Sequence, residues 1–63
     1  MSDSRKSIFV TGAASGLGRE VSRYFAAKGW FVGLADVNEE GLKETAAMLP
    51  DGQWSSHKLD VTN

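Results

Sequence analysis

The segment Thr11-Gly12-Ala13-Ala14-Ser15-Gly16-Leu17-Gly18 lies between an apolar run, Ile8 to Val10, and an amphipathic stretch that begins at Leu17. This position is typical of a turn from a buried strand into a helix. Glycine adopts positive φ and has no Cβ to hold a ligand away, so the three glycines predict a loop that can approach a ligand closely. The N–H groups and the positive dipole end of the following helix suit a pyrophosphate. A glycine-rich turn without a ligand is the alternative that these residues leave open.

The sequence on either side of this loop predicts alternating strands and helices. The expected order is strand 7–11, helix 16–28, strand 30–35, helix 38–49 and strand 53–61. The unbroken apolar centre of the first strand is typical of a parallel sheet that is covered on both faces. Asn38 is a suitable N-cap, and the turn Pro50-Asp51-Gly52 ends the second helix. This order predicts an α/β fold, a Rossmann-type βαβαβ unit with right-handed connections.

Each helix is expected to turn one apolar stripe toward the sheet. In the first helix the stripe at helical spacing is Leu17, Val21, Tyr24 and Phe25, with Lys28 in the last turn. In the second helix it is Leu42, Ala46 and Leu49. Trp30 and Trp54 are expected in the core or at a subunit contact rather than as stacking platforms for a ligand.

Asp36 is the first acid after the second apolar strand and lies 18 residues past Gly18. In a dinucleotide-binding fold, an acid at about this distance hydrogen-bonds the hydroxyl groups of the adenosine ribose. A carboxylate there also repels a 2′-phosphate, by about 4 kcal/mol at ~4 Å and an effective dielectric constant of about 20. Residues 12–18 contain no arginine or lysine to pair with that phosphate. We therefore predict NAD(H) rather than NADP(H); the alternative is that Asp36 only ends a strand in solvent.

Ser15 and the Asp60-Val61 pair are further candidates for cofactor contacts. Ser15 can cap the first helix or hydrogen-bond a phosphate or ribose oxygen, and the two roles are compatible. Asp60 follows the third predicted strand, where its carboxylate can accept a hydrogen bond from the adenine amine while Val61 packs against the ring. Taken alone, Asp60 also fits a plain loop acid.

The composition excludes several classes of protein. A composition of 41% hydrophobic and 24% charged residues is typical of a folded globular protein. Without cysteine, the chain has no disulfide and no thiolate metal site. A net charge of −1 with scattered cations offers no basic surface for nucleic acid or anionic lipid. No apolar run approaches the ~20 residues of a membrane span, and the first six residues are too polar for a signal peptide. We therefore expect a cytoplasmic protein without nucleic-acid or membrane partners.

Two side chains that often carry chemistry are given no catalytic role. His57 is the only histidine, and we expect no serine, cysteine or acid cluster near it, so packing or surface exposure explains it. Tyr24 and Lys28 have the i, i+4 spacing by which a lysine can lower a tyrosine pKa. Because Tyr24 is in line with Val21 and Phe25, it is expected to point toward the sheet and away from the glycine loop. No catalytic residue and no metal ligand is assigned.

The loop at 11–18, Asp36 and the segment Leu59-Asp60-Val61-Thr62 together resemble the N-terminal part of a classical short-chain dehydrogenase/reductase. The glycine pattern of that family is Thr-Gly-x-x-x-Gly-x-Gly, which this chain carries, and the resemblance extends over 8–63. It implies that the pyrophosphate and its ribose are surrounded by Gly12, Ser15, Gly16, Leu17 and Gly18. It also implies that Asp36 holds the adenosine ribose, that Asp60 and Val61 contact the adenine, and that the cofactor is NAD.

The resemblance implies a larger domain than these residues form. Family members are several times longer, and their Asn-Asn-Ala-Gly segment, catalytic serine, later Tyr-x-x-x-Lys pair and substrate loop are absent from these 63 residues. We expect residues 1–63 to be the N-terminal part of a single dinucleotide-binding domain, the first half of a doubly wound parallel sheet. Without the second half, the first strand would have an unpaired edge and uncovered apolar surface.

The activity implied by the resemblance is NAD-dependent hydride transfer between a secondary alcohol and a ketone, with catalytic residues beyond Asn63. It implies a small-molecule substrate and a homo-oligomer, a dimer or tetramer; residues 1–63 alone are expected to be inactive. A non-enzymatic dinucleotide-binding fragment or sensor module is the alternative. A methyltransferase that binds S-adenosylmethionine fits the loop and the acid, but it explains the glycine spacing less well.

Overall fold

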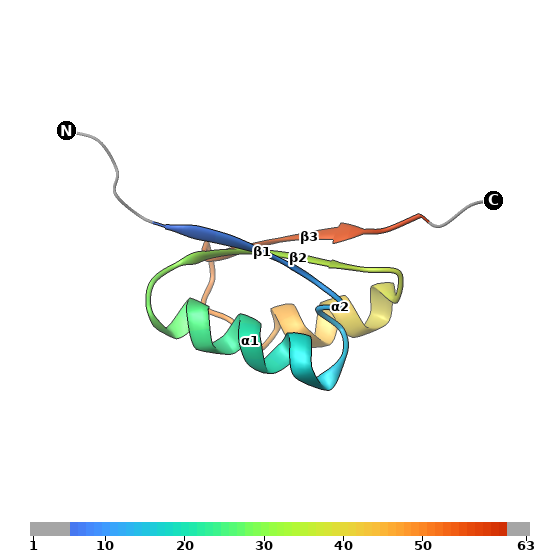
Figure 1. The fold of residues 1–63 in the computed structure, drawn as a ribbon, viewed down its shortest axis with the longest axis horizontal. Coiled ribbons are helices and arrows are strands. Elements are labelled where there is room, and N and C mark those ends of the chain that lie inside the picture. Colours follow the sequence, from blue (N-terminus) through green and yellow to red (C-terminus); the bar gives the residue numbers. More distant parts are fainter. Residues whose placement is uncertain (1–5, 61–63) are drawn as a thin grey trace.

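The computed structural model describes residues 6–60, which form a parallel sheet with helices between its strands (Figure 1). The elements are β1 (Ser7–Thr11), α1 (Gly16–Ala27), β2 (Phe31–Asp36), α2 (Glu39–Ala46) and β3 (Trp54–Lys58). Their order confirms the predicted α/β βαβαβ unit, although α2 and β3 are shorter than expected. Neither helix in this part of the chain is long and apolar enough to cross a membrane.

The sheet has the strand order β1-β2-β3, with β2 in the middle. In the parallel register Thr11 lies opposite Ala35, and Ala35 lies opposite His57. Because all three strands run in the same direction, their carboxyl ends meet at one edge of the sheet. The glycine loop after β1, Asp36 at the end of β2, and Asp60 after β3 therefore follow strands that end at the same edge.

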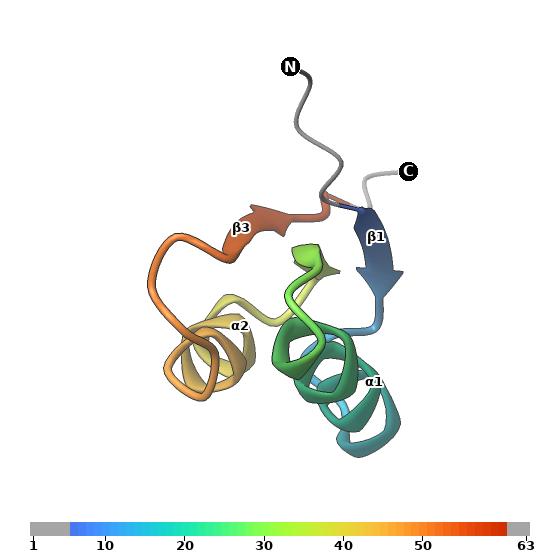
Figure 2. The same cartoon turned by 90° about the vertical axis from the view of Figure 1, so that its left-hand side faces the viewer.

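Both helices lie on the same face of the sheet (Figures 1 and 2). This placement follows from two right-handed crossovers that advance across the sheet in the same direction. Phe9, on the opposite face next to Gly33, is 60% exposed. The apolar run of β1 predicted a strand that is covered on both faces. Within residues 6–60, β1 is covered on one face only. The uncovered apolar surface expected for this half-sheet is present there.

The core lies between the sheet and the helices. Its buried members come from all parts of the unit and are Val10, Ala13, Ala26, Val32, Leu34, Leu42, Ala46 and Leu49. The three predicted contacts of the second helix region are among them, which confirms that stripe. Trp54, on β3, packs against this core, which agrees with the prediction that it lies in the core or at a subunit contact.

The contact face of α1 differs from the prediction. Its buried residues are Gly18, Ser22 and Ala26, whereas Leu17 is 79% exposed and Tyr24 is 58% exposed. A Cβ added at Gly18 would collide with the carbonyl oxygen of Gly12, so the helix lies very close to the loop that precedes it. Since only small side chains fit at so short a separation, the row at i, i+4 and i+8 faces the sheet. The larger Val21 and Phe25 pack at its side, partly buried.

Local sequence sets the start of α2 and the end of α1 as expected. Asn38 is the N-cap of α2, where its side chain accepts a hydrogen bond from the Gly41 N–H at 3.1 Å. Gly29 follows α1 with a φ of 86°, the left-handed conformation of a C′ glycine. Gly41 weakens α2 in isolation, but a Cβ there would lie 2.5 Å from the Cβ of Ala14. Glycine at this position therefore lets α2 approach the glycine loop.

Candidate functional site

The glycine loop is closed by its own hydrogen bonds. Gly12 has a φ of 70°, and its carbonyl oxygen accepts from the Ser15 N–H at 3.0 Å and from the Ser15 hydroxyl at 2.7 Å. The Ser15 Oγ in turn accepts from the Gly18 N–H at 3.2 Å, which makes Ser15 the N-cap of α1. The predicted capping role is therefore confirmed, and the compatible role toward a phosphate or ribose stays a prediction.

The three loop glycines have three different surroundings. Gly12 has a positive φ, a conformation that residues other than glycine rarely adopt. Gly18 is where α1 approaches the loop backbone, so a side chain there would meet protein. At Gly16, by contrast, a Cβ would meet no atom within 4 Å. The sequence motif alone does not distinguish the glycine that faces open space from the two that shape the loop.

The backbone N–H groups at the start of α1 include two that remain free for a ligand. Within residues 6–60, no hydrogen bond engages the N–H groups of Gly16 and Leu17, which belong to the first turn of α1. The neighbouring N–H groups of Ala13, Ala14, Ser15 and Gly18 all have acceptors in the protein. Two free donors at the positive end of a helix, beside the open space at Gly16, suit a phosphate oxygen.

Asp36 is attached to this loop directly. Its Oδ2 accepts a hydrogen bond from the Ala14 N–H at 2.9 Å, and its Oδ1 accepts one from the Asn38 N–H at 2.9 Å. The N–H groups of Asn38, Ala14 and Val37, in that order of effect, lower the pKa of the carboxyl below its ordinary value. A carboxylate has about four acceptor positions, so about two remain for hydroxyl groups of a ligand. The sequence motif gives no sign of the bond to Ala14.

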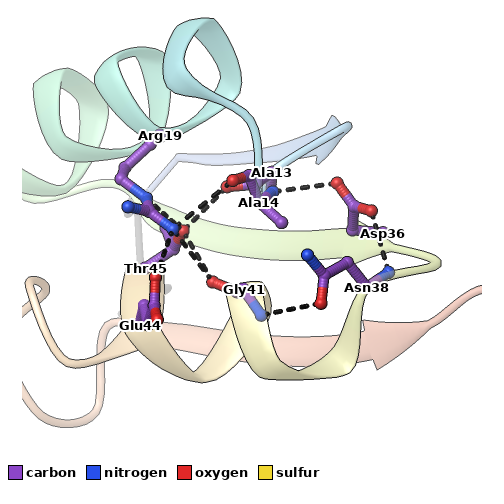
Figure 3. A network of polar contacts seen from close by, with 8 residues as sticks. All are labelled: Ala13, Ala14, Arg19, Asp36, Asn38, Gly41, Glu44 and Thr45. Atoms are coloured by element: carbon purple, nitrogen blue, oxygen red, sulfur yellow. Dashed lines mark hydrogen bonds and ion pairs between the residues drawn. The ribbon is translucent and has the colours of Figure 1, made fainter.

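A partly buried polar network joins α1, α2 and the loop (Figure 3). The Nε of Arg19 donates to the Thr45 hydroxyl at 2.9 Å, and Nη2 lies 3.3 Å from the Gly41 carbonyl oxygen. The same Nη2 reaches the Ala14 carbonyl oxygen at 3.4 Å and the Glu44 carboxylate at 3.3 Å. Sequence reasoning missed Arg19 and Thr45. The one sign of this network in the sequence is an arginine in the first half of a helix, where its positive charge is unfavourable with the positive end of the helix dipole.

Of the remaining predicted site residues, Asp60 follows β3 in the described part of the chain. The Leu59 N–H donates to the Asp36 carbonyl oxygen at 2.9 Å, which brings the backbone after β3 beside Asp36. Asp60, the next residue, is exposed. Val61 lies outside the described residues. The structure thus brings Gly12, Ser15, Gly16, Leu17, Gly18 and Asp36 together at one edge, and it places Asp60 after a neighbouring strand end.

The surroundings of His57 and Tyr24, which were given no catalytic role, differ from those predicted. His57 Nε2 lies 2.9 Å from the Ser55 hydroxyl, and its ring lies 5.8 Å from that of Phe9, so the expectation of no nearby serine is wrong. Side chains two positions apart on a strand share a face, which is the physical reason for the contact. Tyr24 is exposed rather than turned to the sheet, and the Lys28 Nζ lies 5.2 Å from its ring centre. Neither pair contacts the loop.

Comparisons with known proteins agree with this geometry. Residues 6–63 match the family model described as short chain dehydrogenase. The chain is 38% identical over 58 residues to meso-2,3-butanediol dehydrogenase of Serratia marcescens, covering 92% of this chain and 23% of that protein. It is 38% identical over 53 residues to the NAD-dependent glycerol dehydrogenase of Listeria innocua, covering 84% of this chain and 20% of that protein.

Solved structures show the same likeness. A short-chain dehydrogenase from Streptomyces avermitilis matches with a TM-score of 0.76 at 37% identity, over 95% of this chain and 22% of that one. A citronellol catabolism dehydrogenase from Pseudomonas aeruginosa matches with a TM-score of 0.77 at 38% identity, over 87% of this chain and 24% of that one. The chain therefore spans less than a quarter of the length of each of these relatives.

Proposed function

Because the chain belongs to the short-chain dehydrogenase family, we propose that its residues form the NAD(H)-binding part of an oxidoreductase for a secondary alcohol and a ketone. The observation that carries the proposal is the direct hydrogen bond between Asp36 and Ala14. This bond ties the acid proposed for the ribose to the loop proposed for the pyrophosphate. Because the ribose and the pyrophosphate of a dinucleotide are only a few covalent bonds apart, a rigid connection between their two binding sites preorganises the protein for that ligand.

The loop and Asp36 have separate parts in this proposal. The free N–H groups of Gly16 and Leu17 donate to the pyrophosphate, and Gly12, Ser15 and Gly18 hold the loop in the required shape. The remaining acceptor positions of Asp36 receive the ribose hydroxyl groups. Asp60 and Val61 contact the adenine.

The preference for NAD(H) over NADP(H) rests on charge. Asp36 is ionised at neutral pH, since its pKa is lowered, and it repels a 2′-phosphate. Arg19, the cation nearest to the loop in sequence, donates to Thr45, to backbone carbonyl groups and to Glu44. Its guanidinium is therefore engaged with α2 rather than offered to a second phosphate.

The catalytic part of the proposal lies outside these residues. When bound, the nicotinamide ring supplies the hydride acceptor and donor. This chain's residues bind and orient the adenosine and pyrophosphate, and we place the groups that handle the substrate proton beyond Asn63. We also propose the cytoplasm as the compartment, as the composition leads us to expect, and a homo-oligomer as the assembly, as the family resemblance implies.

Calorimetric titration of the complete protein that carries these residues tests the proposal. NAD⁺ is expected to bind, with NADP⁺ at least about tenfold weaker, a difference of ~1.4 kcal/mol. Comparable affinities, or tighter binding of NADP⁺, would contradict the preference. Binding of S-adenosylmethionine in place of either dinucleotide would contradict the dehydrogenase assignment. Binding of NAD⁺ without turnover of any secondary alcohol would favour the sensor alternative.

A further inference from the structure

One peptide unit of the glycine loop is held at both ends by side chains from other elements. The carbonyl oxygen of Ala13 accepts a hydrogen bond from the Thr45 hydroxyl at 2.8 Å, and the N–H of Ala14 donates to Asp36 at 2.9 Å (Figure 3). These two groups belong to the same planar amide. Its orientation is therefore set jointly by α2 and by the end of β2.

Arg19, Thr45 and Ala13 form a chain of hydrogen bonds with one direction. A hydroxyl group has one hydrogen to donate, and an arginine Nε–H can only donate. Since Nε donates to the Thr45 Oγ1 at 2.9 Å, that oxygen must be the acceptor there, and its hydrogen goes to a carbonyl group. The Ala13 carbonyl oxygen at 2.8 Å is closer than the Gly41 carbonyl oxygen at 3.1 Å. The order of donation is thus Arg19 to Thr45 to Ala13.

Water cannot take the place of this hydroxyl in the folded protein. Thr45 is fully buried, with 0% of its surface exposed, and Ala13 is likewise 0% exposed. Removing the hydroxyl would leave both the Ala13 carbonyl and the Arg19 Nε–H without this partner. The amide could then rotate to find another, and its N–H would move relative to Asp36. Thr45 is therefore coupled to the Asp36 carboxylate through one rigid amide.

We propose that Thr45, which Arg19 contacts through a hydrogen bond, is a positioning residue for the dinucleotide site, holding the Ala13–Ala14 amide so that Asp36 and the loop keep a fixed separation. The inference rests on the proposed NAD(H) function. It concerns an α2 side chain that belongs to neither the glycine motif nor the strand-end acid. Its effect on the ligand passes through Ala14 and Asp36 and involves no contact by Thr45 itself.

The decisive variants are Thr45→Val and Thr45→Ser in the complete protein. Valine keeps the shape and removes the hydroxyl, whereas serine keeps the hydroxyl. Thr45→Val should weaken NAD⁺ binding by about tenfold in calorimetry, equivalent to ~1.4 kcal/mol, and Thr45→Ser should restore most of it. Ser22→Ala is the matched control, because Ser22 is also 0% exposed and its hydroxyl also donates to a backbone carbonyl, that of Gly18 at 2.8 Å.

The control separates positioning from stability. Thr45→Val and Ser22→Ala should both lower the midpoint of thermal unfolding, but only Thr45→Val should weaken the cofactor. Equal NAD⁺ affinities of the two variants would overturn the inference. If Thr45→Val does not fold, Arg19→Met replaces it, since Met keeps the helical stem and removes the donor; unchanged NAD⁺ affinity in that variant would overturn the inference as well.

Hydrogen exchange without cofactor gives an independent readout. In protein labelled with ¹⁵N-alanine, the Ala14 amide should exchange slowly in the wild type and in Ser22→Ala, and at least about tenfold faster in Thr45→Val. Unchanged protection of Ala14 in Thr45→Val would contradict the coupling. A wild-type protein that binds no NAD⁺ would contradict the proposed function instead, so the two failures are distinguishable.

Discussion

The carboxylate of Asp36 accepts a hydrogen bond from the Ala14 N–H at 2.9 Å, although 22 positions separate the two residues. The acid at the end of β2 is thus part of the glycine loop's own structure. Any ligand that uses Asp36 finds a carboxylate already fixed by two backbone donors, Ala14 and Asn38. Changes at Asp36 are therefore expected to affect both the loop and the ligand.

Stability in acid should depend on Asp36. Its pKa is lowered in the folded state by the N–H groups of Asn38 and Ala14, so the ionised form stabilises the fold. This contribution is fully present above the ordinary value of 3.8 and is lost as the pH falls through the lower, folded-state pKa. Urea unfolding between about pH 5 and about pH 2 should show this loss in the wild type and not in Asp36→Asn. Asp51→Asn, in an exposed turn, is the control and should keep the wild-type pH dependence.

Neutralising Asp36 should reduce the discrimination between cofactors. Asp36→Asn removes the charge that repels a 2′-phosphate, so the NADP⁺ affinity should approach that of NAD⁺. NAD⁺ should also bind more weakly, by about tenfold, because Ala14 and Asn38 donate to different carboxylate oxygens and the asparagine NH₂ that replaces one of them cannot accept. Calorimetric titration with both dinucleotides measures the two effects. An unchanged ratio of affinities would show that Asp36 does not face the ribose.

Alanine at Gly18 should reduce stability, whereas alanine at Gly16 should reduce NAD⁺ affinity. Gly18→Ala places a Cβ against the Gly12 carbonyl group, and we expect it to destabilise the fold by about 2–3 kcal/mol. Gly16→Ala meets no protein atom and should leave stability within about 1 kcal/mol of the wild type, since alanine favours the helix. It should nevertheless weaken NAD⁺ by about tenfold, because its Cβ occupies the space proposed for the pyrophosphate. Thermal unfolding measures the stability of both variants, and calorimetry measures their NAD⁺ affinity. A stable Gly16→Ala with full NAD⁺ affinity would show that the phosphates bind elsewhere.

Tyr24 should be dispensable for turnover. The side chain is 58% exposed on α1 and contacts Lys28 and Phe25 rather than the loop. Tyr24→Phe in the complete enzyme is expected to keep kcat within about twofold, whereas loss of a general acid or base typically costs at least about a hundredfold. A loss of that size in steady-state kinetics would assign Tyr24 to the chemistry.

Sequence reasoning recovered the elements because the signals for them are local. The apolar runs, the caps Ser15 and Asn38, and Gly29 after α1 all act within a few residues of themselves, so their effect can be read without knowing the packing. The stripe on α1 was predicted correctly for Val21 and Phe25, which pack against the core, and incorrectly for Leu17 and Tyr24, because apolar spacing does not reveal how closely a helix approaches a sheet. At Gly18 that approach is so close that small side chains face inward and Tyr24 faces out.

The sequence by itself determined the βαβαβ order, the position of the glycine loop before α1 and the acid at the end of β2, since each depends on residues adjacent in the chain. Only the tertiary structure decided that Asp36 binds Ala14, that Thr45 holds the Ala13 carbonyl, and that Arg19 joins α1 to α2. These contacts span 22, 32 and 26 positions, and no local rule specifies them. They form because parallel strands end at one edge and both helices pack on one face, which brings distant donors and acceptors within hydrogen-bond distance.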